Sequence, residues 1–244
     1  MASETVLYSM TGRVARITLN RPDRRNLINQ QLADELAEAC LRAELDDGVY
    51  LVALTGAGEA FCAGSELAPG QSYPAAAVAG ISKPVIAAIN GDALGEGLEL
   101  ALACDIRLAA ASARLGLPQV SGGRLPADGG TQRLARIVGR ARALEMLLTA
   151  QDVTAAEALA IGLVSRVAEC NLAAELDALV ENLSAKAPLS LRFIKEAVGK
   201  GMDLTLEQGL RLEADLYFLL HTTADRTEGI RAFLEKRPPH FTGR

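Results

Sequence analysis

Aromatic side chains and histidines are scarce in this sequence. It has no tryptophan, aromatic residues make up 4% of its 244 residues, and its two histidines, His221 and His240, both lie near the C-terminal end. Stacked nucleic-acid bases need aromatic platforms, and the formal charge of −5 gives no general attraction for a polyanion. We therefore expect no nucleic-acid partner. A serine–histidine hydrolase is also disfavoured, because neither Ser65 nor Ser121 is centred in a Gly-x-Ser-x-Gly turn.

The sequence also lacks the patterns of metal sites, membrane spans and secretory signals. Its four cysteines lie far apart and form no Cys-x-x-Cys pair, so we expect no structural zinc site. No apolar run approaches the roughly 18 residues of a spanning helix. The first residues, MASET, do not combine a basic stretch with an apolar one. We expect a cytoplasmic protein that contacts no membrane.

Strands alternate with helices in the first part of the chain. Half of the residues are hydrophobic and 23% are charged, which is enough apolar surface for a sizeable core. Residues 14–19 alternate in character as a half-buried strand does, and a helical pattern runs from Asn29 to near Gly48. Continuous apolar runs, typical of strands buried on both faces, follow at 49–54, 84–89 and 105–109. Strands separated by helices predict parallel pairing in an α/β fold.

Helices dominate the sequence from Gly129 onward. Pro188 suits the first turn of a helix, and Pro238 with Pro239 ends the last one. The pattern predicts helices at 130–138, 141–148, 154–161, 171–186, from 188, at 204–221 and at 225–236, with a possible strand at 163–167. We divide the chain into an α/β body at residues 1–185 and a C-terminal helical region at residues 186–244.

Two segments share one design, in which a buried strand runs into a glycine-rich turn and then into a helix. They are residues 54–67 and residues 89–101. Glycine lets the main chain approach a ligand closely, and a helix start offers free N–H groups with partial positive charge. Such turns suit a phosphate or a developing oxyanion, although each turn taken alone is explained at least as well as a simple connection. Neither completes a Gly-x-Gly-x-x-Gly fingerprint.

Together with their neighbours, the two turns resemble the enoyl-CoA hydratase/isomerase (crotonase) family. The similarity extends in order over nearly the whole chain. Its motifs are LNRP at 19–22, FCAGSEL at 61–67, KPVIAAING at 83–91, ALGEGLELA at 93–101, CD at 104–105, GGTQRL at 129–134, GLV at 162–164 and FLEKR at 233–237. This pattern indicates the family more specifically than it indicates the reaction.

The resemblance implies a spiral of strand–strand–helix units whose C-terminal helical region mediates trimerisation, with trimers that often pair into hexamers. It also implies an acyl-CoA substrate whose thioester oxygen is held by two backbone N–H groups, here those of Ser65 and Glu96. An enolate-like transition state places negative charge on that oxygen, so loss of one such donor typically costs about 10²–10³ in rate. The residues implied to contact CoA are Arg25, Ala63, Leu67, Phe233 and Lys236.

Family hydratases use two glutamates that share one water, and this chain keeps only the first. Glu99 matches the first glutamate and lies one helical turn after Glu96. The second position falls on Gln119, whose carboxamide can orient a water but cannot shuttle a proton near neutral pH. Since general acid–base assistance is commonly worth about 10²–10⁴ in rate, we expect weakened hydratase activity. Family isomerases with one carboxylate generally keep the one that this chain has lost.

Two further carboxylates stand near these positions. Glu96 replaces the usual glycine. If its side chain shares the pocket with Glu99, repulsion and desolvation would raise one pKa and create an acid; if it points away, only its N–H matters. Asp128 lies one position from where some relatives carry a catalytic aspartate, and capping of the following helix is the simpler explanation.

We therefore expect a CoA-thioester enzyme that stabilises an enolate, and most simply a hydratase-like lyase. Glu99 is the expected acid/base, the N–H groups of Ser65 and Glu96 form the oxyanion hole, and Gln119 positions water or substrate. We expect no metal or redox cofactor, because transfer of a proton and water involves no net electron change. The alternatives are isomerisation, decarboxylation or carbon–carbon bond hydrolysis with Glu99, Glu96 or Asp128, and a catalytically silent acyl-CoA binder.

Overall fold

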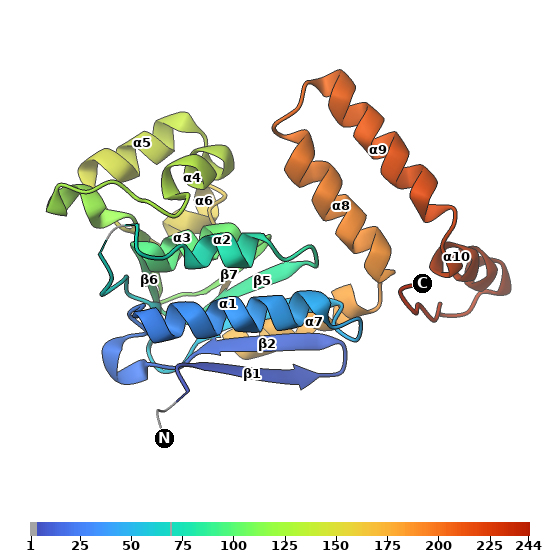
Figure 1. Ribbon diagram of the computed structural model, residues 1–244, viewed down its shortest axis with the longest axis horizontal. Helices are drawn as coiled ribbons and strands as arrows, with labels where there is room; N and C mark the ends of the chain where they lie inside the picture. Colours follow the sequence, from blue (N-terminus) through green and yellow to red (C-terminus); the bar gives the residue numbers. More distant parts are fainter. Residues whose placement is uncertain (1–3, 69) are drawn as a thin grey trace.

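A six-stranded sheet with helices on both faces forms the centre of the computed structural model, which describes residues 4–68 and 70–244 (Figure 1). β1 pairs with β2 as an antiparallel hairpin, and every later pair of neighbours in this sheet is parallel. The predicted parallel pairing is therefore confirmed. The strands lie in the order β1 (Val6–Thr11), β2 (Val14–Leu19), β3 (Leu51–Gly56), β5 (Val85–Ile89), β7 (Ile106–Ala110) and β10 (Arg166–Ala168).

The three central strands, β3, β5 and β7, are buried on both faces, as their apolar runs predict. α1 (Gln30–Leu45) covers one face of the sheet and α7 (Leu172–Ser184) covers the other (Figure 1). Successive side chains of a strand point to opposite faces. Leu51 of β3 accordingly packs in the cluster that contains Leu176 of α7, whereas the next residue, Val52, belongs to the cluster of Leu36 of α1.

A second sheet of short strands runs beside the first, in the order β4-β6-β8-β9. Each central strand of the large sheet leads into one strand of the small sheet and then into a helix, so the expected spiral of strand–strand–helix units is confirmed. The units continue β3 with β4 (Ala60–Cys62) and α2 (Pro74–Ala79), β5 with β6 (Asp92–Leu94) and α3 (Glu96–Ala103), and β7 with β8 (Arg114–Gly116), the short 3-10 helix η2 (Pro118–Gly122) and α4 (Gly130–Val138).

The strand expected at 163–167 lies further along the chain. β10 spans Arg166–Ala168, and Leu163 and Val164 lie in a turn ahead of it. Both are buried, and both donate their N–H groups to the carbonyl of Ala158, which closes the preceding helix. Their apolar character therefore reflects burial in the core rather than pairing in the sheet. The remaining elements of the body are the short 3-10 helix η1 (Pro22–Arg24), α5 (Arg140–Thr149), β9 (Val153–Thr154) and α6 (Ala155–Ala160).

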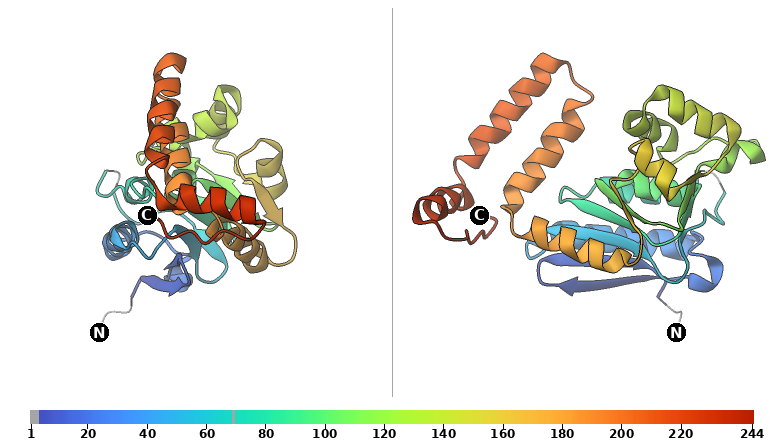
Figure 2. Two further views of the ribbon diagram at one scale, coloured as in Figure 1. Left: turned by 90° about the vertical axis from the view of Figure 1, so that its right-hand side faces the viewer. Right: turned by 180° about the vertical axis from the view of Figure 1, so that it is seen from behind.

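The C-terminal helices stand beside the body as an arm (Figures 1 and 2). They are α8 (Pro188–Gly201), α9 (Leu206–Leu220) and α10 (Ala224–Glu235), close to the predicted ranges. Lys195 of α8 anchors the arm, since its ammonium lies 2.7 Å from Asp105 and donates to the carbonyl of Lys83. Many large apolar side chains of the arm are exposed, among them Phe218 and Phe233. The division of the chain at residues 185 and 186 stays a prediction.

Across residues 4–68 and 70–244, none of the helices has both the length and the apolar character that crossing a membrane requires.

Candidate active site

The two glycine-rich turns meet at one point of the structure. β4 and β6 are parallel neighbours, and the turns that follow them contain Gly64 and Gly95. These glycines have φ angles of 128° and 56°, which favour residues without a side chain. A Cβ built on Gly95 would lie only 3.8 Å from Cα of Gly64. Ser65 follows Gly64 and Glu96 follows Gly95, so these two residues lie on adjoining segments of the main chain.

The N–H groups of Ser65 and Glu96 are available to a ligand. Ile28 donates its N–H to the Gly64 carbonyl at 2.9 Å and accepts from Glu66 N–H at 2.8 Å, so the Ser65 N–H points away from Ile28. Glu96 is the first residue of α3, where an N–H has no partner inside the helix. Within the described residues neither amide has an acceptor. Two free amides on adjoining loops are what an oxyanion hole requires.

A cavity opens at this point between the two turns and the loop that precedes α4. The structure brings to its wall most of the residues that the sequence singled out. They are Ser65, Leu67, Glu96, Glu99, Gln119 and Asp128.

Glu99 is fully buried at the inner end of this cavity. Its Oε1 accepts hydrogen bonds from the N–H groups of Asp128, at 2.8 Å, and Gly130, at 2.7 Å. Its Oε2 lies 3.5 Å from Nε2 of Gln119 and has no closer partner within the described chain. Burial raises the pKa of Glu99, the two amide hydrogen bonds oppose this shift, and the charges of Asp128 and Glu96 add to it. One oxygen is therefore fixed in place, and the other is available for proton transfer.

Gln119 faces Glu99 from the other wall of the cavity. It belongs to η2, is 4% exposed, and its Oε1 has no hydrogen-bond partner within the described residues. Buried polar side-chain atoms nearly always have a partner. The free amide oxygen can therefore accept a hydrogen bond from a water or a substrate, while Nε2 faces the carboxylate of Glu99.

Glu96 does not point away from the cavity. Its side chain lines the wall, and its Oε2 would lie 3.6 Å from a Cβ built on Gly64. It contributes to the raised pKa of Glu99 through like-charge repulsion, but burial of Glu99 contributes more. Repulsion from Glu96 therefore adds to the raised pKa of Glu99, but it contributes less than the charge of Asp128 and less than burial, which is the largest cause.

Asp128 does not cap the following helix, so that explanation is wrong. α4 begins after Gly129 and has no side-chain cap. The Asp128 carboxylate instead accepts the N–H of Ala75, at 2.5 Å, in the first turn of α2. α2 needs this distant partner because its own N-cap, Tyr73, makes no side-chain cap. Asp128 is thus a second buried carboxylate on the wall that Glu99 also lines, and this burial raises its pKa.

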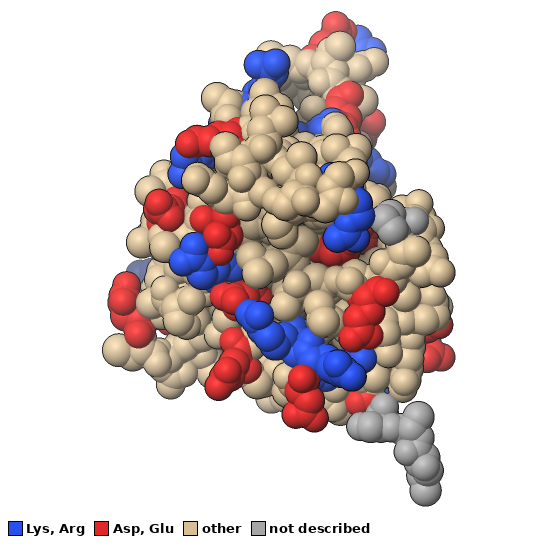
Figure 3. Space-filling model, turned by 90° about the vertical axis from the view of Figure 1, so that its left-hand side faces the viewer, with Lys and Arg blue, Asp and Glu red and all other residues tan. Residues whose placement is uncertain are grey.

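Three of the residues expected to contact CoA surround the first turn. Ala63 donates its N–H to the carbonyl of Arg25, at 3.0 Å, and Leu67 donates its N–H to Oγ of Ser65, also at 3.0 Å. The Arg25 guanidinium forms an ion pair with Asp92. At this end of the molecule, basic side chains form a band bordered by acidic ones (Figure 3). The band offers local positive charge on a chain that is acidic as a whole.

A single chain does not bring Phe233 and Lys236 to the cavity. Phe233 is 83% exposed on α10, and Lys236 follows the end of that helix. α10 lies at the far side of the arm, away from α3 and β6 (Figure 1). The expectation that these residues reach the acyl-CoA site is therefore not met within one chain.

Gly130 and Arg124 belong to the site and were not recognised from the sequence. Gly130 supplies an N–H to Glu99, and a Cβ at this position would lie 2.9 Å from Oε1 of Glu99. The paired glycines at 129–130 were the available signal, since a residue without a side chain is needed where a carboxylate approaches the main chain. Arg124 lines the cavity from the loop after η2, and no motif marks it.

The chain is similar over its whole length to known enzymes. The sequence model of the family described as enoyl-CoA hydratase/isomerase matches residues 9–244. The 2,3-dehydroadipyl-CoA hydratase of Escherichia coli strain K12 is 39% identical, with 98% of this chain and 99% of that protein covered. The crotonyl-CoA hydratase of Syntrophomonas wolfei is 37% identical, with 99% of each chain covered.

A solved structure of the same kind has the same fold. The crystal structure of an enoyl-CoA hydratase from Bacillus anthracis matches with a TM-score of 0.94 at 37% identity, covering 98% of this chain and 100% of that one. The crotonase-like spiral is thus shared with a solved enoyl-CoA hydratase at 37% identity. This chain belongs to the enoyl-CoA hydratase/isomerase family.

Proposed function

We propose that this enzyme adds water to, and removes water from, a 2-enoyl-CoA thioester. The arrangement of Glu99 carries this proposal: a fully buried carboxylate has one oxygen fixed by two amides and the other facing Gln119, at the end of the cavity that holds the two free N–H groups. The names of the relatives support it, since hydratases of 2,3-dehydroadipyl-CoA and crotonyl-CoA are among them.

In this mechanism the N–H groups of Ser65 and Glu96 hold the thioester oxygen. Water attacks the β carbon as Glu99 Oε2 takes one of its protons, and charge develops on the thioester oxygen as the enolate forms. Gln119 Oε1 accepts the second O–H of that water and so orients it. Glu99 then returns its proton to the α carbon, which completes the addition of H and OH. The raised pKa of Glu99 suits it to both steps, because it must hold a proton between them.

Restoring a carboxylate opposite Glu99 should increase hydration. We expect Gln119→Glu to raise kcat for crotonyl-CoA by about 10-fold or more, because a second acid would relieve Glu99 of one of its two proton transfers. Loss of the crotonyl-CoA absorbance measures the rate. Gln151→Glu, at an exposed position outside the cavity, is the matched control and should leave kcat unchanged.

Three outcomes of this assay lead to different functions. A rise in Gln119→Glu alone supports a hydratase that works with one carboxylate. Rapid wild-type hydration without any gain would show that the second acid is not needed. Tight binding of CoA thioesters without turnover of any of them would favour a silent acyl-CoA binder.

A second candidate reaction is isomerisation, decarboxylation or carbon–carbon bond hydrolysis at the same site. Asp128 favours it, because this buried carboxylate lies on the wall of the cavity beside Glu99 and could serve as the second acid. A panel of 3-enoyl, malonyl-type and β-keto CoA thioesters separates these reactions from hydration. Turnover of one of them above that of crotonyl-CoA would replace the first proposal.

We also propose that the enzyme assembles as a trimer or as a pair of trimers. Phe233 and Lys236 lie far from the cavity of their own chain, so only another copy could bring them to an acyl-CoA. Exposed apolar side chains along the arm, including Val198, Leu210 and Phe218, offer the surface that such an assembly would bury. Analytical ultracentrifugation should give three or six times the chain mass. A monomer at micromolar concentration would contradict this proposal.

A further inference from the structure

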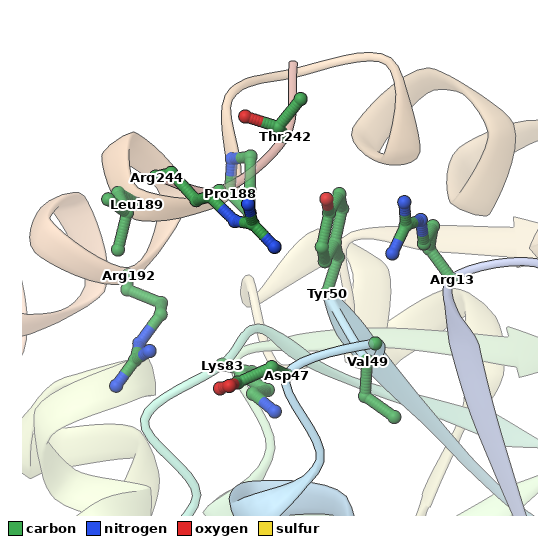
Figure 4. Close-up of a pocket in the computed structure, with 12 residues that line it drawn as sticks. Arg13, Asp47, Val49, Tyr50, Lys83, Pro188, Leu189, Arg192, Thr242 and Arg244 are labelled. Atoms are coloured by element: carbon green, nitrogen blue, oxygen red, sulfur yellow. The ribbon is translucent and has the colours of Figure 1, made fainter. Parts of the chain in front are cut away.

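A second cavity lies between the body and the C-terminal arm (Figure 4). Its volume is about 570 Å³. Arg13, Tyr50 and Lys83 line it, and each of them shortly precedes one of the parallel strands β2, β3 and β5. The two glycine-rich turns follow the opposite ends of β3 and β5. This cavity therefore lies at the amino-terminal ends of these strands. The site around Glu99 lies beyond their carboxyl ends and is separate from it.

Basic side chains predominate on the wall of this cavity. Arg13, Lys83, Arg192 and Arg244 line it, against one acidic side chain, that of Asp47. Within the described residues, the guanidinium groups of Arg13 and Arg244 have no carboxylate within ion-pair distance, and Arg192 lies 3.9 Å from Glu44. An excess of unpaired positive charge in a cavity that is partly closed to solvent attracts anions.

Lys83 adds a buried ammonium group to this wall. It is 3% exposed, and it donates hydrogen bonds of 2.7 Å to the carbonyls of Ala43 and Asp46. An ammonium group has three N–H donors, so one of them has no acceptor within the described chain.

The hydroxyl of Tyr50 lacks a partner in the same place. Tyr50 is 6% exposed, and its hydroxyl makes no hydrogen bond within the described residues. Its ring stands in the cavity between Arg13 and Pro188, with the hydroxyl end toward the C-terminal segment (Figure 4). The Arg13 guanidinium stacks on the ring, 4.7 Å from its centre. Because buried hydroxyls are nearly always hydrogen-bonded, this group indicates a missing acceptor or donor in the cavity.

The start of α8 points to the same kind of ligand. Pro188 and Leu189 line the cavity and are the first residues of this helix of 14 residues. Pro188 has no N–H, but those of Leu189 and Ser190 in the first turn have no partner inside the helix and carry partial positive charge. Together with two free guanidinium groups and a hydroxyl, they form a combination that suits an oxyanion.

The C-terminal segment is held in position beside the cavity. The buried carboxylate of Asp225 accepts the N–H groups of Thr242, at 2.6 Å, and Gly243, at 2.9 Å. A main-chain oxygen of Arg244 accepts the N–H groups of Ala224, at 2.6 Å, and Asp225, at 3.2 Å. These bonds fix the last residues against the start of α10, so the guanidinium of Arg244 comes to the cavity from an ordered main chain.

We propose that this cavity binds the oxyanion group of a small metabolite, a phosphate or a carboxylate, between Arg13, Tyr50 and Arg244. Arg13 and Tyr50 belong to the body, and Arg244 belongs to the C-terminal arm, so the bound ligand would contact both parts of the chain. The volume leaves room for a molecule with more than one anionic group. The proposal is independent of the reaction at Glu99.

Calorimetric titration of the full-length protein tests this proposal. Pyrophosphate and citrate serve as probes of the phosphate and carboxylate chemistries. We expect saturable binding of at least one of them, with one site per chain, and a rise in Tm in its presence. Arg13→Ala combined with Arg244→Ala should weaken binding by about 10-fold or more, because charge-assisted hydrogen bonds are lost. Tyr50→Phe should weaken it severalfold while the stacking on Arg13 is kept.

Two control variants separate this site from others. Arg140→Ala removes an exposed arginine outside the cavity and should bind the probe as the wild type does. Arg24→Ala combined with Arg25→Ala should also have no effect, because these residues lie near the first turn. Loss of binding in that double variant would instead assign the probe to the acyl-CoA site.

Either of two results would overturn the proposal, one measured on the wild type and the other on the variants. Absence of saturable binding of both probes up to about 10 mM would do so. Binding that is unchanged in the variants of Arg13, Arg244 and Tyr50 would do so as well. Arg13 and Arg244 are exposed, and loss of the stacking of Arg13 on Tyr50 should lower Tm without ligand by no more than about 4 °C, so a loss of binding is not a loss of folding.

Discussion

Replacing Glu99 with glutamine should lower kcat for an enoyl-CoA thioester by about 10³-fold while leaving CoA affinity close to that of the wild type. The carboxamide cannot accept and return a proton near neutral pH. The residue that faces Glu99 Oε2 is Gln119, whose carboxamide cannot take over the proton transfer either. The loss should therefore be confined to the chemical step, since the substitution leaves the N–H groups of the two turns and the residues expected to contact CoA unchanged. Steady-state kinetics and a binding titration with a CoA thioester separate the two effects.

The pH dependence of thermal stability tests whether the Glu99→Gln variant is correctly folded. Burial raises the pKa of Glu99, so ionising it in the folded protein costs free energy that the unfolded chain does not lose. The wild type is therefore favoured below the ordinary pKa of glutamate and loses this contribution as the pH rises. The glutamine side chain avoids that cost, and its Oε1 can accept the same two N–H groups. At pH 7 the Tm of Glu99→Gln should be at least that of the wild type, and the difference should shrink in acid.

Glu96→Gln is the matched control for this prediction. It removes a neighbouring carboxylate on the same helix but keeps the N–H group that is expected to hold the thioester oxygen. Its kcat should fall far less than that of Glu99→Gln. Equal losses in the two variants would mean that the charge of the cavity, rather than proton transfer by Glu99, sets the rate. Unchanged turnover in Glu99→Gln would remove this residue from the mechanism.

The four inner strands of the large sheet, β2, β3, β5 and β7, were predictable, but the small sheet was not. Apolar runs of five or six residues, as in β3 and β5, are long enough to show that both faces are buried. β4, β6 and β8 have three residues each, which is too short for any alternation to be seen. β1, at the edge of the large sheet, was also missed, because its apolar residues do not alternate with polar ones and most of its side chains are exposed.

Residues of the site were predictable where they lie in motifs and not where they meet across loops. The motifs around Ser65, Glu96 and Glu99 are continuous in sequence, and the structure places all three on one cavity. The contact of Asp128 with Ala75 joins positions 53 residues apart, and no local pattern encodes it. The short helix α2 lacks a cap of its own, which becomes apparent only when its first turn is seen in space.

Substitution of Gly97 by alanine should have the second large effect, by displacing both turns at once. Gly97 lies in the first turn of α3, where a Cβ would stand 2.0 Å from the carbonyl oxygen of Cys62 and 2.7 Å from its carbon. These are main-chain atoms of β4, which cannot turn aside as the end of a side chain can. β4 leads to Ser65, and α3 begins with Glu96, so the clash separates the two amides. We expect a loss of about 3 kcal/mol in stability and of at least about 10² in kcat.

Gly199→Ala provides the comparison within another helix of the same chain. A Cβ on Gly199 in α8 would meet no atom within 4 Å, so alanine should raise stability there by up to about 1 kcal/mol through its higher helix propensity. Thermal unfolding and crotonyl-CoA kinetics, measured on both variants, separate the steric effect from the change in residue type. Because α3 and β4 approach so closely only if the turns are packed as described, a Gly97→Ala enzyme with wild-type Tm and kcat would contradict this packing and the oxyanion hole built on it.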